Sequence, residues 1–138
     1  NADLAASWYE KAAWRGSAHA ANNRAWIAIK GSGGDGRNAD LTLAARYWAL
    51  AVILGRRETT RQALEALGRM PDPVKTAAVQ QMLKEGGLYA GAIDGRSGPA
   101  TRGGLARALD DVPADVTGQL VELTRKKWIG SRPRFDLL

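Results

Sequence analysis

The sequence predicts an all-α protein in which two helix-pair solenoid repeats pack against a three-helix module. Three observations lead to this prediction. An internal repeat begins at Leu4 and again at Leu43, an offset of 39 residues, which lies in the range typical of helical repeat proteins. Apolar residues recur at spacings of three and four through most segments. Gly and Pro fall between these segments, where helices end and begin.

The amino-acid composition limits which kinds of site the protein can contain. The 138 residues, 45% of them hydrophobic, suffice for one mid-sized domain or two small ones with a packed core. There is no Cys, which excludes disulfides and thiolate chemistry, and the single His, His19, excludes a His-rich metal site. The net charge of +6 fits either a solvated basic surface or attraction to an anionic polymer, such as nucleic acid, a membrane or a cell wall.

Targeting signals are not visible in the sequence. No apolar run approaches the roughly 20 residues that span a bilayer, and the first residues already have a helical pattern rather than that of a signal peptide. We therefore expect the chain to be a piece of a longer protein.

Residues 1–70 form the predicted repeat domain, with helices at about 2–14, 18–30, 40–54 and 58–69. At the same offset, Gly16 aligns with Gly55, after which the second copy becomes irregular, as a terminal capping unit does. The first copy resembles the Sel-like repeat, a relative of the tetratricopeptide repeat. That resemblance is carried by Ala5, Trp8, Tyr9, Lys11, Ala12, Ala13, Gly16, Ala18 and Ala20. It implies a scaffold that binds partner proteins.

The second predicted domain, residues 71–138, begins after Met70, where Pro71 and Pro73 disfavour helix in the residues before them. Helices are expected at 74–85, at 98–109 and from Pro113 onward, and the segment from Gly130 is expected to be a tail. The last helix should bury a stripe of apolar residues, namely Val116, Leu120, Leu123 and Trp128.

A glycine-rich loop from Leu88 to Thr101 organises this second domain. Asp94-Gly95 is a strong turn pair, and Pro99 suits the first turn of a helix. The spacing resembles the peptidoglycan-binding-domain-like family, a three-helix module. The matching residues are Val79, Gln80, Leu83, Gly87, Leu88, Tyr89, Gly91, Ile93, Asp94, Gly95, Gly98, Pro99 and Thr101. The sequence departs from the family pattern at Ser97, where an aromatic is usual, and at Gly103-Gly104, where Ala-Ala is usual.

The candidate binding residues follow from these resemblances. For peptidoglycan they are Tyr89, Asp94, Arg96, Thr101 and Arg102, grouped around a helix N-terminus whose N–H groups favour carboxylates. The alternative role for Asp94 is to stabilise the turn through hydrogen bonds to its own backbone. Trp14 is the candidate partner contact, and packing against a neighbouring unit or the second module is its alternative role. The other repeat aromatics are expected to pack between helices, namely Trp8, Tyr9, Trp26, Tyr47 and Trp48.

No set of residues indicates catalysis, a metal site or a cofactor, so we expect a protein that is not an enzyme. The resemblances imply a C-terminal fragment of a larger bacterial protein. It would be a periplasmic module that binds peptidoglycan, scaffolds partner proteins, or does both, as in a cell-polarity or localisation factor. The alternative is a protein-interaction or enzyme-regulatory module whose wall-binding site has degenerated. Nucleic acid is a weaker candidate, because the Trp residues fall at repeat-core positions and the Arg residues are scattered.

Overall fold

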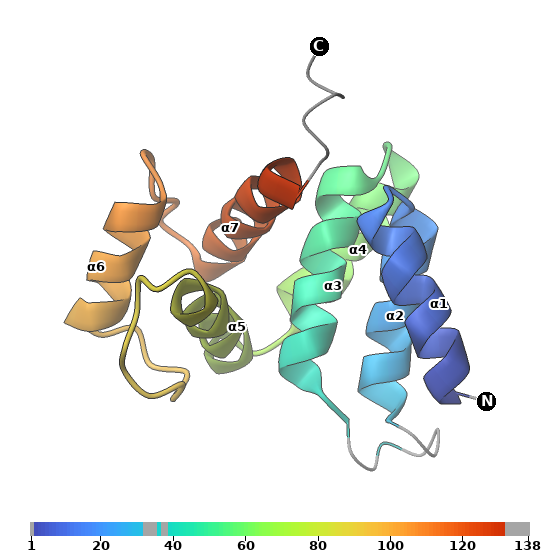
Figure 1. Cartoon of the computed structure of the whole chain (residues 1–138), viewed down its shortest axis with the longest axis horizontal. Coiled ribbons are helices and arrows are strands. Elements are labelled where there is room, and N and C mark those ends of the chain that lie inside the picture. Colours follow the sequence, from blue (N-terminus) through green and yellow to red (C-terminus); the bar gives the residue numbers. More distant parts are fainter. Residues whose placement is uncertain (1, 32–35, 37–38, 132–138) are drawn as a thin grey trace.

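The computed structural model describes residues 2–31, 36 and 39–131, and these residues form helices and no strands (Figure 1). The predicted all-α class is confirmed. In chain order the helices are α1 (Ala2–Trp14), α2 (Ala18–Lys30), α3 (Leu41–Leu54), α4 (Glu58–Arg69), α5 (Asp72–Glu85), α6 (Pro99–Ala108) and α7 (Val116–Ser131).

Local capping explains several of the helix boundaries. The Ser17 hydroxyl accepts the backbone N–H of Ala20 at 3.1 Å, and the Asp40 carboxylate accepts that of Leu43 at 3.0 Å. Each side chain therefore satisfies one of the N–H groups that have no partner inside the first turn of a helix. Most of the inter-repeat loop after Gly31 lies outside the described residues.

Two of the predicted helix starts are wrong. Helix α5 begins at Asp72, two residues earlier than expected, because Pro73 lies in the first turn, where a missing N–H costs nothing. Helix α7 begins at Val116 rather than Pro113, and the carbonyl of Asp115 accepts its early hydrogen bond, from Gln119 at 3.1 Å. Helix α7 also continues to Ser131, through the start of the predicted tail; residues 132–138 of that tail lie outside the described part of the chain.

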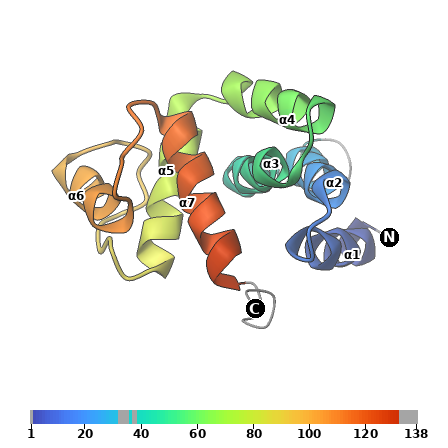
Figure 2. The same cartoon turned by 90° about the horizontal axis from the view of Figure 1, so that it is seen from above.

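Helix α3 is the centre of the molecule. It packs against α2 and α4 on one side and against α5 and α7 on the other, as the view from above shows (Figure 2). Its buried residues surround the helix axis rather than forming one stripe, which is the pattern of a helix enclosed by neighbours. They are Ala44, Ala45, Tyr47, Trp48, Ala49, Leu50 and Ala51.

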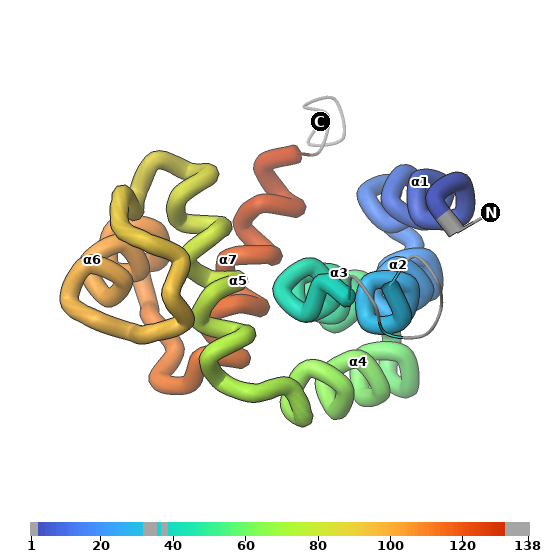
Figure 3. The backbone as a smooth tube through the Cα atoms, turned by 90° about the horizontal axis from the view of Figure 1, so that it is seen from below, coloured from blue at the N-terminus to red at the C-terminus, as the bar shows by residue number. Residues whose placement is uncertain are grey.

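The remaining helices extend outward from this centre. Helix α1 lies beyond α2 at one end, and α6 lies beyond α5 at the other (Figures 1 and 3). One hydrophobic cluster runs from α1 to α7 and includes Met70, which precedes α5. The predicted stripe on α7 is buried at Leu120 and Leu123, whereas Val116 and Trp128 are half-buried. The two predicted units are therefore joined through a shared core.

Candidate functional site

The loop between α5 and α6 is organised around the side chain of Gln80, which is completely buried. Its Oε1 accepts the backbone N–H groups of Asp94 and Gly95, each at 3.0 Å. Its Nε2 lies within hydrogen-bond distance of four oxygens, which share its two hydrogens. These are Tyr89 OH at 3.4 Å, Asp94 Oδ1 at 3.0 Å, Arg96 O at 2.9 Å and Thr101 Oγ1 at 3.1 Å. One α5 side chain thus fixes the whole loop.

Gly95 occupies the turn of this loop with a φ of 74°, in the left-handed region that favours glycine. A Cβ at this position would lie 2.7 Å from the carbonyl oxygen of Pro73. The backbone of the loop therefore approaches the start of α5 at a distance that only glycine permits. The Asp-Gly pair of the sequence motif is explained by this turn and by the two N–H groups that Gln80 accepts.

Two of the five predicted peptidoglycan residues point inward. Tyr89 is 9% exposed and Thr101 is 2% exposed. The Tyr89 hydroxyl donates to the carbonyl of Ala92 at 2.5 Å, while Thr101 belongs to the Gln80 network. The structure brings both residues together with Asp94, but as internal supports of the loop. Their burial means that neither offers a surface for a sugar ring.

Asp94 acts as a turn residue. Its Oδ1 accepts the backbone N–H of Arg96 at 2.9 Å, two residues further along the chain. This hydrogen bond, followed by the one from the Gln80 amide, holds the pKa of the Asp94 carboxyl below its ordinary value. The carboxylate therefore remains charged while it holds the turn.

Arg96 and Arg102, like Asp94, lie on the surface. Arg102 donates from Nη1 to the carbonyl of Ser97 at 3.1 Å, which holds it beside the start of α6. Gly98, the N-cap of α6, offers no side-chain cap for the first turn. We refer to Arg96 and Arg102 as the α6 N-terminal patch. It combines two positive charges with the positive end of a helix dipole.

A second positively charged surface, not predicted from the sequence, lies at the other end of α6. Here a groove of about 500 Å³ opens between the end of α5, the end of α6 and α7. We call it the cationic groove; it is lined by Met82, Leu83, Glu85, Gly86, Leu88, Arg107, Ala108, Leu123, Lys126 and Lys127. Arg107 and Lys126 donate to the backbone carbonyls of Leu88 and Ala108. These contacts hold the two cations at the rim without neutralising their charge.

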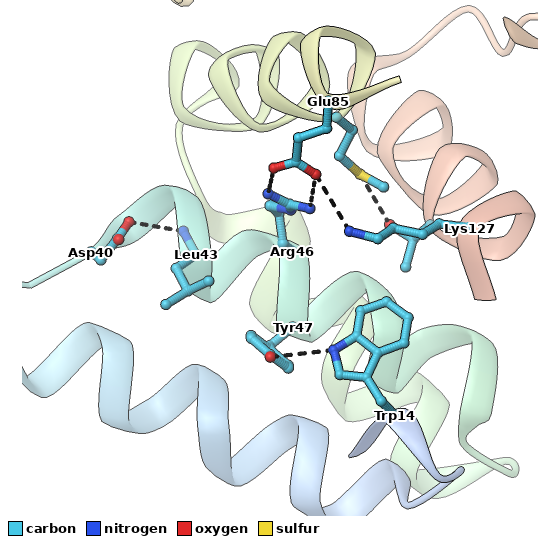
Figure 4. A network of polar contacts seen from close by, with 9 residues as sticks. Trp14, Asp40, Leu43, Arg46, Tyr47, Glu85 and Lys127 are labelled. Carbon is cyan, nitrogen blue, oxygen red and sulfur yellow. Dashed lines mark hydrogen bonds and ion pairs between the residues drawn. The ribbon is translucent and has the colours of Figure 1, made fainter. Parts of the chain in front are cut away.

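Trp14 lies where the first unit meets the second (Figure 4). Its ring stacks on Trp128 with centroids 6.3 Å apart, and its Nε1 donates to the hydroxyl of Tyr47 at 3.4 Å. Lys127 Nζ lies 5.4 Å from the centroid of the Trp14 ring, within range of a cation–π interaction. The half-buried side chain therefore packs against the second unit, which was its alternative role.

A charged cluster beside Trp14 connects α3, α5 and α7 (Figure 4). Both carboxylate oxygens of Glu85 accept from the Arg46 guanidinium at 2.8 Å, and Lys127 lies 3.4 Å away. The hydrogen bonds from Arg46 are the main reason that the pKa of Glu85 is lowered. Because the pair is bidentate, it fixes orientation as well as distance between the two units.

The prediction that the other repeat aromatics pack between helices is wrong for Trp8, which is 68% exposed, and holds only in part for Trp26, which is 45% exposed. Trp26 meets Trp48 edge-on, with ring centroids 5.3 Å apart, and both line a hollow of about 490 Å³ that α4 and the Met70-Pro71 connection complete. We call it the Trp26 groove. The sequence repeat could have predicted the exposure of Trp26. At the offset of 39 residues, Trp26 aligns with Glu65, a charged residue that is exposed in the structure.

In residues 2–31, 36 and 39–131, no three His, Asp or Glu side chains lie close enough together to hold a metal ion. His19 is exposed. Within the same ranges, none of the helices has the length and apolar character needed to cross a bilayer.

Comparisons with protein-family models, with curated proteins and with solved structures find no match to this chain. The functional proposal therefore depends on the residues and surfaces described above.

Proposed function

We propose that the protein is a non-catalytic module of the bacterial periplasm that binds peptidoglycan and scaffolds partner proteins. In this proposal the first four helices are Sel-like repeats and the last three are a peptidoglycan-binding-like unit that closes the repeat array. The parent protein would be a cell-envelope factor, such as a polarity or localisation protein.

The observation that carries the proposal is the chemistry of the cationic groove. Its floor is apolar, with Met82, Leu83, Leu88 and Leu123, and its rim holds Arg107 and Lys126. The carboxylate in the lining, Glu85, is paired with Arg46 and Lys127. A peptidoglycan stem peptide presents alanine methyl groups and several carboxylates. The apolar floor would then contact the methyl groups of the stem peptide, and the cationic rim would bind its carboxylates. The net charge of +6 adds long-range attraction to an anionic wall.

The α6 N-terminal patch is the other candidate location for the ligand. It was the site predicted from the sequence, and it offers charge without an apolar floor, since Tyr89 is buried. The two surfaces lie at opposite ends of α6, whose 10 residues correspond to about 15 Å at 1.5 Å per residue. Mutations can therefore separate them.

The test is co-sedimentation with purified peptidoglycan sacculi at low and at physiological salt. Two double variants that make the same charge change are compared, Arg107→Glu/Lys126→Glu in the groove and Arg96→Glu/Arg102→Glu in the patch. Circular dichroism and thermal unfolding verify that both remain folded. We expect wild-type binding that persists at physiological salt and that is lost in the groove variant.

The other outcomes are equally informative. Loss only in the patch variant would locate the wall site at the Asp-Gly loop. Equal loss in both variants, with binding that disappears in salt, would mean non-specific attraction between charges. Absence of binding by the folded wild-type protein would rule out wall recognition by this chain.

The Trp26 groove favours a second function, that of a protein-interaction module without wall binding. An exposed Trp in an apolar hollow is typical of a protein-binding anchor, and here Leu41, 42% exposed, lies beside Trp26. Capture of partners from envelope extract, compared between wild type and Trp26→Ala, tests this alternative. Partners that depend on Trp26, together with absent binding to sacculi, would favour it.

A further inference from the structure

A cavity of about 140 Å³ lies at the junction of the two units, lined by α3, α5, α7 and the end of α1. Its apolar side consists of Leu43, Leu50, Met82 and the ring of Trp14. Leu50 is buried, whereas the other three are half-buried. Apolar cavities of about 150 Å³ bind molecules of the size of benzene. The cavity therefore has room for one ring or a short branched chain.

Tyr47 provides the first polar group of the lining. Its hydroxyl accepts the indole N–H of Trp14 at 3.4 Å, but its own proton has no acceptor among the residues that the structure describes (Figure 4). Burial is the main reason that the pKa of Tyr47 is raised, so the hydroxyl remains protonated at pH 7. A buried donor without an acceptor is unfavourable, and a bound molecule can supply the missing partner.

Two cations, Arg46 and Lys127, line the same cavity. Glu85 neutralises one of these charges: Arg46 donates to both of its oxygens at 2.8 Å, and Lys127 lies 3.4 Å away (Figure 4). The neighbouring Arg24, which lies over the Tyr47 ring, is paired with Glu10 at 2.8 Å. The described lining contains no carboxylate of its own. It therefore offers hydrogen-bond donors and one positive charge in excess.

We propose that this cavity binds a small monocarboxylate whose body is apolar and about the size of one ring. The carboxylate accepts the Tyr47 hydroxyl and is attracted by the excess charge of Arg46 and Lys127. The body of the molecule packs against the apolar side, as in most small-molecule sites. An uncharged or cationic molecule of the same shape lacks this attraction. Because the walls come from both units, the bound molecule contacts both.

The test is an NMR titration of the full chain with benzoate, benzamide and benzylamine. These three molecules have similar shapes and are anionic, uncharged and cationic. The signals followed are the Met82 methyl and the Trp14 indole N–H, which lie in the cavity lining. We expect both to shift saturably with benzoate, with a Kd of about 1 mM or lower. Benzamide and benzylamine should bind at least about tenfold more weakly, and Tyr47→Phe should weaken benzoate binding by about tenfold.

Three variants establish where benzoate binds, and thermal unfolding verifies that each is folded. Leu43→Phe fills part of the cavity and should abolish the shifts. Leu41→Phe is the same substitution on the same helix, but it lies in the Trp26 groove and should leave them unchanged. Met82 and Lys127 also line the cationic groove, so Arg107→Glu/Lys126→Glu is the third variant and should retain benzoate binding.

Three results would overturn the proposal. The first is the absence of a saturable shift in the folded wild-type protein at about 10 mM benzoate, ten times the expected Kd. The second is equal binding of the three probes, which would mean that the positive charge does not select the ligand. The third is loss of benzoate binding in Arg107→Glu/Lys126→Glu, which would place the carboxylate in the cationic groove. None of these results depends on binding to sacculi.

Discussion

Replacement of Gln80 by Leu should release the loop that carries most of the sequence motif. Leu is close to Gln in volume, so the cavity contribution is small. The loss is that of hydrogen bonds: the N–H groups of Asp94 and Gly95 lose their acceptor, and the loop oxygens lose their donor. A buried polar group left without a partner costs about 1–3 kcal/mol, so two such groups predict a loss of about 2–6 kcal/mol. Such a loss is a large part of the 5–15 kcal/mol typical of a domain.

The assay is urea unfolding followed by far-UV circular dichroism, combined with hydrogen exchange at Asp94 and Gly95. The matched control is Gln81→Leu, the same substitution one position along α5, where the side chain is half-buried. We expect the control to change the free energy of unfolding by less than about 1 kcal/mol. Equal midpoints for the two variants, or unchanged exchange at the two loop amides in Gln80→Leu, would refute the reasoning.

Four further predictions concern packing and charge. Gly103→Ala should stabilise the protein by about 0.5–1 kcal/mol through helix propensity, because the new Cβ meets only Arg107, at 3.5 Å. Gly104→Ala should destabilise it by about 1–2 kcal/mol, since that Cβ would lie 2.7 Å from the carbonyl oxygen of Leu88; the reverse order in a thermal unfolding comparison would contradict both. Glu85→Gln should lower the free energy of unfolding at pH 7 by only about 0.5–1 kcal/mol, because solvent screens the partly exposed ion pair. The folded pKa of Glu85 is lowered, so its contribution is present above the ordinary value of 4.5 and is lost as the pH falls through the folded value; urea midpoints that differ equally at pH 7 and pH 3 would contradict this. Trp14→Ala should cost about 2–3 kcal/mol by removing the stack on Trp128, and an unchanged Tm would contradict it.

Much of the secondary structure could be predicted because it depends on local chemistry. The helix at 18–30 follows from its Ser17 cap and the one at 40–54 from its Asp40 cap. The start of α7 was placed wrongly at Pro113, because a proline is compatible with both a first turn and a preceding extended segment. Which of the two conformations Pro113 adopts depends on contacts made by the segment between α6 and α7. One of them is the hydrogen bond that Gln119 Nε2 donates to the Pro113 carbonyl at 3.0 Å.

The candidate site was less predictable than the helices. The motif located the loop correctly, but it could not tell which of its residues face solvent. Tyr89 and Thr101 are buried because Gln80 reaches the loop from another helix. The cationic groove was missed because its rim residues, Arg107 and Lys126, are 19 positions apart in the sequence and meet only when α6 and α7 both pack against α5.

The sequence by itself determined the helical class, most helix boundaries, the Asp-Gly turn and the 39-residue repeat, because spacing, capping and turn chemistry act over a few residues. Only the tertiary structure decided which members of each repeated pair are covered. Tyr47 is buried and Trp8 is exposed although they occupy the same repeat position. The physical reason is that burial depends on the neighbouring helices and not on the residue or on its local sequence: α3 is enclosed by α2, α4, α5 and α7, whereas α1 packs mainly against α2.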